Sequence, residues 1–131
     1  MKKGFACGVF DLFHAGHVLM LKECKENCDY LIIALNKAEN LPVGKNIPIY
    51  SFEERKLIIE SIRYVDEVIG YNSEEELIEL LKNGNISIRF LGDDYKNKPI
   101  TGKDLVPIYF INRDHGLSSS KLRQKLKNDT K

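Results

Sequence analysis

Short apolar runs of strand length alternate along the chain with longer segments of helical period, and this alternation constrains the fold more than any other feature. An unbroken apolar strand is covered on both faces of its sheet, and helices that follow strands in sequence provide that cover. The alternation therefore predicts an α/β fold with a doubly wound, Rossmann-like parallel sheet. Because 131 residues suit one domain, residues 1–131 are expected to form a single unit.

Five apolar runs have the length of a strand and predict a five-stranded sheet. The expected strands cover residues 3–10, 30–35, 67–71, 86–91 and 106–111. Pro107 lacks the amide hydrogen that a central strand donates, so the fifth strand is expected at an edge of the sheet.

Helical period and capping residues place three helices between these strands and a fourth after them. They are expected at 16–27, at 52–63, after Ser73 as far as residues 83–84, and from a hydroxyl-rich cap at 118–120 onward. Ser73 and Glu76 have the spacing of a capping box. In the second helix, the expected buried stripe consists of Leu57, Ile58, Ile62 and Val65.

Charge and composition exclude several classes of function. Lys plus Arg number 20 and Asp plus Glu number 19, so the net charge of +1 offers no basic excess for nucleic-acid phosphates, and no nucleic-acid partner is expected. No segment approaches the roughly 18 apolar residues of a membrane span, and Gly8 and Asp11 interrupt the first apolar run, which makes a poor signal peptide. Three cysteines cannot all pair within one chain, so reduced thiols and a cytoplasmic location are expected.

The turn from the first strand into the first helix carries the sequence GVFDLFHAGH, residues 8–17. It leaves the carboxyl end of a strand, where a doubly wound sheet binds its ligands. His14 and His17 bracket Gly16 at the expected helix start, an arrangement that suits an anion because helix N-termini and imidazole donors stabilise phosphate oxygens. Asp11 is suited to orienting a histidine or binding a metal ion. Each residue alone also fits a structural role, but two of the three histidines in the chain fall here.

This decapeptide resembles the G-x-F-D-x-x-H-x-G-H signature of the cytidylyltransferase family. Three further blocks, in the same order and at matching spacing, are similar to segments of the glycerol-3-phosphate cytidylyltransferases within that family. They are RYVDEV at 63–68, GDDY at 92–95 and RDHGLSSS at 113–120. The first block alone is shared by a wider superfamily of nucleotidyltransferases, so it indicates the reaction class more sharply than the substrate.

The resemblance implies direct cytidylyl transfer. A phosphate oxygen of glycerol 3-phosphate, or of a similar polyol or amino-alcohol phosphate, would attack the α-phosphorus of CTP, and pyrophosphate would leave. Such a reaction needs positioning and charge neutralisation more than covalent help from the protein. The resemblance further implies a magnesium ion, no organic cofactor, a homodimer, and a product used in cell-envelope or capsule synthesis.

Carried over by position, the resemblance assigns roles to individual residues. It places the catalytic, charge-stabilising groups at His14, His17, Arg63 and Lys45. It places nucleotide contacts at Gly8, Val9, Phe10, Asp11, Gly16, Asp94, Arg113, Ser118 and Ser119, with Asp11 as a possible metal ligand. The structural alternatives are a cation at a helix C-terminus for Arg63, a solvated loop lysine for Lys45, and ordinary N-capping for the two serines.

Departures from the family pattern leave the substrate open. Lys45 is a single basic residue in its loop, residues 114–115 replace a Thr-Glu pair, and the stretch 96–103 adds three lysines that either bind an acceptor or are solvated. An adenylyltransferase of the same superfamily, using ATP, is the alternative within the enzyme class. Outside it, the alternatives are a nucleotide sensor without catalysis and a metal or redox site on Cys7, Cys24, Cys28 and the histidines. Buried thiols explain the cysteines better, because Cys24 and Cys28 fall on the apolar side of a helix.

Overall fold

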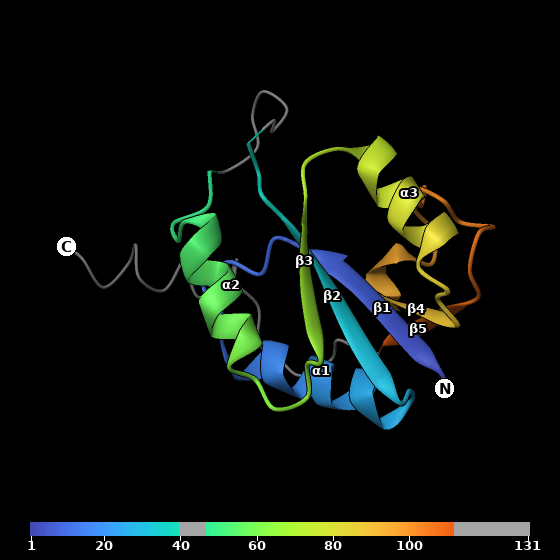
Figure 1. Cartoon of the computed structure of the whole chain (residues 1–131), viewed down its shortest axis with the longest axis horizontal. Coiled ribbons are helices and arrows are strands. Elements are labelled where there is room, and N and C mark those ends of the chain that lie inside the picture. Colours follow the sequence, from blue (N-terminus) through green and yellow to red (C-terminus); the bar gives the residue numbers. More distant parts are fainter. Residues whose placement is uncertain (40–46, 112–131) are drawn as a thin grey trace.

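The computed structural model describes residues 1–39 and 47–111 of the chain. Lys45, Arg113, Ser118, Ser119 and the expected terminal helix lie outside these described residues. Within them, strands and helices alternate as the sequence predicts (Figure 1).

Five parallel strands form one sheet in the order β3-β2-β1-β4-β5 (Figure 1). Their bounds are β1 Lys3–Gly8, β2 Tyr30–Asn36, β3 Glu67–Tyr71, β4 Ile88–Gly92 and β5 Ile108–Ile111. The strand order reverses between β1 and β4, which pair directly although β2 and β3 separate them in the chain. The Rossmann-like prediction is thereby confirmed, with a topological switch point beside β1. The fifth strand lies at an edge, as Pro107 predicts.

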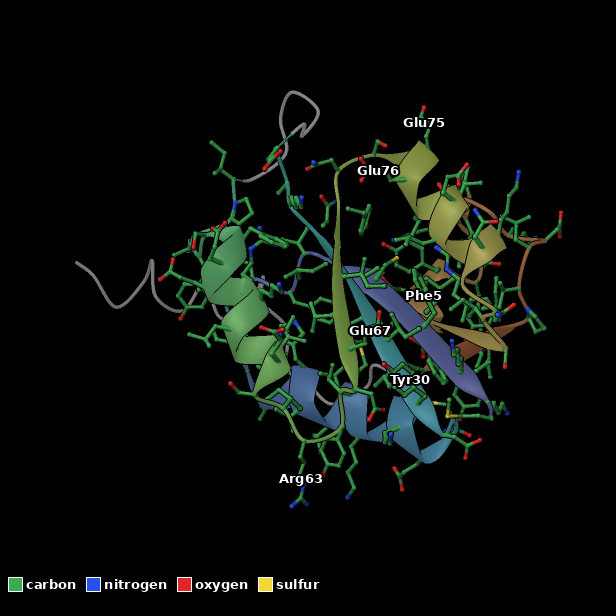
Figure 2. All side chains as sticks on the ribbon, viewed as in Figure 1. Phe5, Tyr30, Arg63, Glu67, Glu75 and Glu76 are labelled. Atoms are coloured by element: carbon green, nitrogen blue, oxygen red, sulfur yellow. The ribbon has the colours of Figure 1, made fainter. Side chains whose placement is uncertain are left out.

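Helices cover both faces of the sheet. Two of them, α1 Ala15–Glu26 and α2 Phe52–Glu60, pack on one face, and α3 Glu74–Asn83 packs on the other (Figure 1). Side chains of β2 alternate between the two cores, since Ile33 faces α1 and α2 while Ile32 faces α3. Phe5 of β1 lies in the α3 core (Figure 2). Because β2 is buried on both faces, its sequence is the unbroken apolar run that predicted it.

The buried face of α2 differs from the expected stripe. Leu57 is 66% exposed, so its place in that stripe was wrong, although Ile62 and Val65 do pack against the core. The core-facing positions of the helix belong instead to Ile59 and Arg55. The sequence pattern failed here because an arginine, which normally faces solvent, occupies a buried position.

Hydroxyl caps begin both α2 and α3. Ser51 and Glu54 form a complete capping box, each side chain accepting from the other's amide. The expected box at α3 is half formed: Ser73 accepts from the Glu76 amide at 3.2 Å, while the Glu76 carboxylate accepts from the Asn72 amide, one residue before the cap. Helices that begin this way have their first free amides satisfied.

Candidate active site

A pocket of about 590 Å³ lies at the carboxyl ends of β1 and β4, where the strand order reverses. Its walls come from the end of β1 and the following turn (residues 6–10), from residues 89–92 of β4, and from residues 99–101. His17 lines it from α1, and Tyr71 lines it from the end of β3. Its position is where a doubly wound sheet binds ligands, and its volume is that of a small-molecule site.

His14 and His17 cap the first turn of α1 for each other. His14 is the N-cap residue, and its Nδ1 accepts from the Gly16 amide at 3.0 Å. The Nδ1 of His17 accepts from the His14 amide at 3.1 Å. In a neutral imidazole one nitrogen accepts and the other carries the hydrogen. Both neutral rings therefore carry their hydrogen on Nε2, which makes that atom the donor a phosphate oxygen needs.

The first amides of α1 are less open to an anion than the sequence suggests. The Gly16 amide donates to the His14 ring, and the His17 amide donates to the His14 carbonyl at 3.0 Å. These two amides are therefore already committed within the turn.

Aromatic rings hold His17 in place. Its ring lies 4.2 Å from the His14 ring, stacks on Phe13 at 5.0 Å and meets the edge of Phe10 at 5.8 Å between centroids. His17 is 8% exposed. A ring fixed on three sides and by its own hydrogen bond is preorganised, which is what charge stabilisation in a transition state requires.

The turn between β1 and α1 has an unusual backbone. Phe10 and Leu12 both adopt left-handed conformations, with φ of 51° and 48°. Non-glycine residues rarely adopt this conformation, and it persists only where the surroundings fix it. Here Leu12 is buried and Asp11 between them is 5% exposed. Strained backbone of this kind concentrates at functional sites.

Asp11 joins this turn to the segment that precedes α2. Its two carboxylate oxygens accept from the amides of Ile49 and Tyr50, at 2.7 and 2.9 Å. The sequence predicts that Asp11 orients a histidine or binds a metal ion, whereas these two hydrogen bonds hold backbone amides of another segment. In the described part of the chain no three His, Cys, Asp or Glu side chains are placed to hold a metal ion. Those residues therefore do not form a protein cage for magnesium.

Arg55 is the organising residue that the sequence analysis missed. It is 1% exposed, and its guanidinium donates to four backbone carbonyls. The acceptors are the carbonyls of Tyr50, Val9, Asn36 and Lys37, at 3.1, 2.9, 2.7 and 3.2 Å. Burial lowers the pKa of Arg55, and the nearby Asp11 carboxylate opposes that shift. The side chain thus ties the ends of β1 and β2 to the start of α2.

Arg63 and Asp94 lie outside the pocket wall, and Asp11, His14 and Gly16 are also not among the residues that line it. Arg63 follows the end of α2 instead of lying on its last turn. It is exposed and points away from the sheet (Figure 2), with its guanidinium 5.3 Å from the Tyr64 ring. Asp94 is exposed on η1, the short 3-10 helix Asp93–Tyr95, while Gly92 and Tyr95 on either side line the pocket. Gly8, Val9, Phe10 and His17 line it directly.

The lysine-rich stretch after η1 reaches the pocket through its uncharged residues. Lys96, Lys98 and Lys103 are exposed, whereas residues 99–101 line the wall. Lys96 and Lys98 lie over the rings of Phe110 and Tyr95, at 5.8 and 5.5 Å from their centroids. These contacts fit the solvated alternative for the lysines.

The cysteines do not form a redox or metal centre in the described chain. Cys7, Cys24 and Cys28 are free thiols, and Cys24 is fully buried. Burial raises the pKa of Cys24 far above its ordinary value and also raises that of Cys28. Protonated, buried thiols are poor nucleophiles and poor ligands.

Comparison with known proteins identifies close relatives. A cytidylyltransferase-like family model matches residues 5–125. The glycerol-3-phosphate cytidylyltransferase of Bacillus subtilis (strain 168) is 38% identical over 127 residues, which is 96% of this chain and 98% of that protein. The protein of the same name from Staphylococcus aureus (strain NCTC 8325 / PS 47) is 33% identical over 129 residues and 96% of each chain.

A longer relative and a solved structure extend the comparison. The bifunctional protein HldE of Granulibacter bethesdensis is 36% identical over 107 residues, which is 79% of this chain and 21% of that protein. The crystal structure of the lipopolysaccharide core biosynthesis protein from Thermoplasma volcanium GSS1 has a TM-score of 0.64 at 24% identity, covering 98% of this chain and 88% of that one. At that identity, the likeness shows the shared fold alone.

Proposed function

The chain belongs to the cytidylyltransferase-like family and is an enzyme of that class, and from this premise we propose that it transfers CMP from CTP to a small phosphorylated alcohol. Glycerol 3-phosphate, or a closely similar polyol or amino-alcohol phosphate, is the proposed acceptor. The observation that carries the proposal is the preorganised His14–His17 pair at the switch point, in a chain that matches glycerol-3-phosphate cytidylyltransferases over 96% of its length.

The proposed reaction is a single in-line displacement. An oxygen of the acceptor phosphate forms a bond to the α-phosphorus of CTP, the bond from that phosphorus to the bridging oxygen of the β-phosphate breaks, and pyrophosphate leaves with the electron pair. The product is a CDP-linked alcohol. Negative charge spreads over the phosphoryl oxygens as the bonds exchange, and the Nε2–H groups of His14 and His17 stabilise it.

Asp11 and Arg55 act as positioning residues in this proposal. They fix the turn after β1, whose Gly8, Val9 and Phe10 line the pocket, against the segment entering α2. Roles for Arg113, Ser118 and Ser119 as further phosphate or nucleotide contacts, and for Arg63 and Asp94, are part of the proposal and rest on their positions in the family blocks. The role of Lys45 rests on its place in the loop where the family has basic residues.

Magnesium enters the proposal as part of the nucleotide substrate. The ion commonly binds substrate phosphates with only one or two carboxylates from the protein, so the missing cage among the described residues suits a magnesium–CTP complex. No organic cofactor is proposed.

The proposal also covers location and assembly. No helix among residues 1–39 and 47–111 has the length and apolar character to cross a bilayer. We place the enzyme in the cytoplasm, where CTP is available, and assign its product to cell-envelope or capsule synthesis.

A homodimer is proposed, and Leu19 and Leu57, which are 44% and 66% exposed, offer apolar surface for it. Sedimentation analysis measures the assembly.

His17→Asn tests the proposed reaction at its centre. The asparagine oxygen is as many bonds from Cα as Nδ1 is, so it can still accept from the His14 amide, but the Nε2–H donor is gone. We expect acceptor-dependent pyrophosphate release from CTP to fall about a thousandfold. Circular dichroism should show that the variant stays folded, although the lost ring contacts lower its melting temperature, and this keeps the loss of activity attributable to chemistry. Turnover close to that of the wild type would remove His17 from the mechanism.

A further inference from the structure

Arg89 of β4 is a second buried arginine, and it faces the pocket. It is 3% exposed in a strand whose other side chains are apolar, and it lines the wall together with Cys7 and Thr101. A charged group withdrawn from water is costly unless it is paired or fully hydrogen-bonded. The partners of this guanidinium therefore indicate what it is for.

The described residues satisfy only part of the guanidinium. One Nη donates to the carbonyl of Thr101 at 2.5 Å, and the other approaches the sulfur of Cys7 at 3.9 Å, a weak contact. The Nε of Arg89 is buried and has no hydrogen-bond partner among the described residues. A guanidinium has five N–H donors in a planar fork, so most of this one is uncommitted within that part of the chain.

No described carboxylate neutralises Arg89. Among residues 1–39 and 47–111, Lys25 and Asp66 form an ion pair, but no carboxylate there lies within ion-pair distance of Arg89. Glu74 also lines the pocket but is exposed and lies beyond ion-pair distance. Tyr71, 7% exposed beside Cys7, is neutral because burial raises the pKa of its phenol. The buried charge in this wall of the pocket is therefore the Arg89 cation.

Arg89 and His17 approach the pocket from opposite faces of the sheet. Cys7, which contacts Arg89, packs with the α3 core, whereas Phe10 and Phe13, which hold His17, pack with the α1 and α2 core. The pocket passes around the end of β1 and joins the two faces. A ligand that spans it meets the His17 imidazole on one side and the Arg89 guanidinium on the other.

We propose that Arg89 binds an oxyanion of the acceptor substrate and is a specificity-determining residue for that substrate. The inference rests on the proposed function and adds to it a position for the acceptor. A guanidinium fork matches the oxygens of a phosphate or a carboxylate in a two-point contact. The oxyanion is either the phosphate that reacts or a second acidic group at the other end of the acceptor.

Two acceptors with the same carbon skeleton show whether Arg89 binds the reacting phosphate or a second acidic group. Glycerol 3-phosphate carries the phosphate alone, and 3-phosphoglycerate has a carboxylate in place of the terminal hydroxymethyl group. In Arg89→Met, we expect the dissociation constant of the bound acceptor, measured by calorimetry, to rise about ten- to hundredfold, while that of CTP stays within about twofold. A rise for both acceptors identifies the phosphate, and a rise confined to 3-phosphoglycerate identifies a second acidic group. Arg89→Lys should recover part of the affinity.

A matched pair at Cys7 tests the same idea with Arg89 in place. Cys7→Asp puts a carboxylate beside the guanidinium, satisfies it from within the protein, and should weaken acceptor binding as much as Arg89→Met. Cys7→Ser is the neutral control and should bind acceptors like the wild type. This pair keeps the proposal testable if Arg89→Met fails to fold.

Three results would overturn the inference. They are unchanged acceptor affinity in Arg89→Met, a loss of CTP affinity in place of acceptor affinity, and equal acceptor binding by Cys7→Asp and Cys7→Ser. Because binding is measured without turnover, a wild type that binds both acceptors through Arg89 but makes no product from CTP would refute the proposed function and leave this inference standing.

Discussion

Arg55 and Arg89 are both almost completely buried near the pocket, yet their surroundings differ. Arg55 donates to four backbone carbonyls from three segments, whereas Arg89 donates to one carbonyl and approaches a thiol, with its Nε unpartnered among the described residues. A buried cation that is fully hydrogen-bonded stabilises the fold around it. A buried cation that lacks hydrogen-bond partners lowers the stability of the fold until a ligand provides them. The comparison separates a residue that builds the site from one that the site offers to substrate.

Arg55→Met should produce the largest loss of stability. It leaves four carbonyls at the ends of β1 and β2 and before α2 without their donor. We expect the free energy of unfolding to fall by about 3 kcal/mol or more, measured by urea denaturation. Arg55→Lys keeps a cation but not the planar guanidinium, so its free energy of unfolding should lie between those of Arg55→Met and the wild type. If Arg55→Met lost less than about 1 kcal/mol of unfolding free energy, Arg55 would not hold these segments together, and the structural role that distinguishes it from Arg89 would be wrong.

Asp66→Asn should cause a smaller loss of stability than Arg55→Met, and one that depends on pH. Partial burial opposes ionisation of Asp66, but hydrogen bonds from the Lys25 ammonium and the Leu31 amide outweigh it and lower its pKa below the ordinary 3.8. A lowered carboxyl pKa contributes stability above the unfolded pKa, and that stability is lost as pH falls through the folded value. We expect Asp66→Asn to lose about 1 kcal/mol at pH 7. The difference should shrink as pH falls below about 4 and disappear once pH has passed the lower, folded pKa. A difference that persisted in acid would contradict the assigned pKa direction.

Arg89→Met should have the smallest effect on stability. Replacing a poorly satisfied buried charge by an apolar side chain of similar length is often neutral or stabilising. We expect the free energy of unfolding to change by less than about 1 kcal/mol in either direction. A loss as large as that of Arg55→Met would show that Arg89 also serves the fold, and the distinction between the two arginines would fail.

The same two arginines show how far the sequence can be interpreted. Strand and helix positions followed from apolar periodicity, and the histidine motif was placed correctly at the start of α1. Arg55 and Arg89 stand in segments whose period indicates burial, but a charged residue there is normally assigned to solvent, so neither was predicted. Their burial depends on carbonyls, a thiol and a pocket brought together by distant segments, and no local pattern contains that information.

The geometry of the histidine pair was also beyond the sequence. Spacing predicted two imidazoles near one helix end, but not that each Nδ1 would accept a backbone amide and so place the hydrogen on Nε2. The left-handed backbone at Phe10 and Leu12, just before the pair, was not predicted either, because non-glycine residues rarely adopt it. The expected end of α2 was likewise three residues too late, because the apolar residues after Glu60 pack on the core without continuing the helix.

Pyrophosphate release from CTP and, separately, from ATP, each with magnesium and with or without glycerol 3-phosphate, tests the central claim most directly. We expect release with CTP only, dependent on the acceptor, together with a CDP-linked product in equal amount. Release with ATP alone would assign the chain to adenylyl transfer, and release from CTP without acceptor would indicate hydrolysis. Either result would contradict cytidylyl transfer to a phosphorylated alcohol.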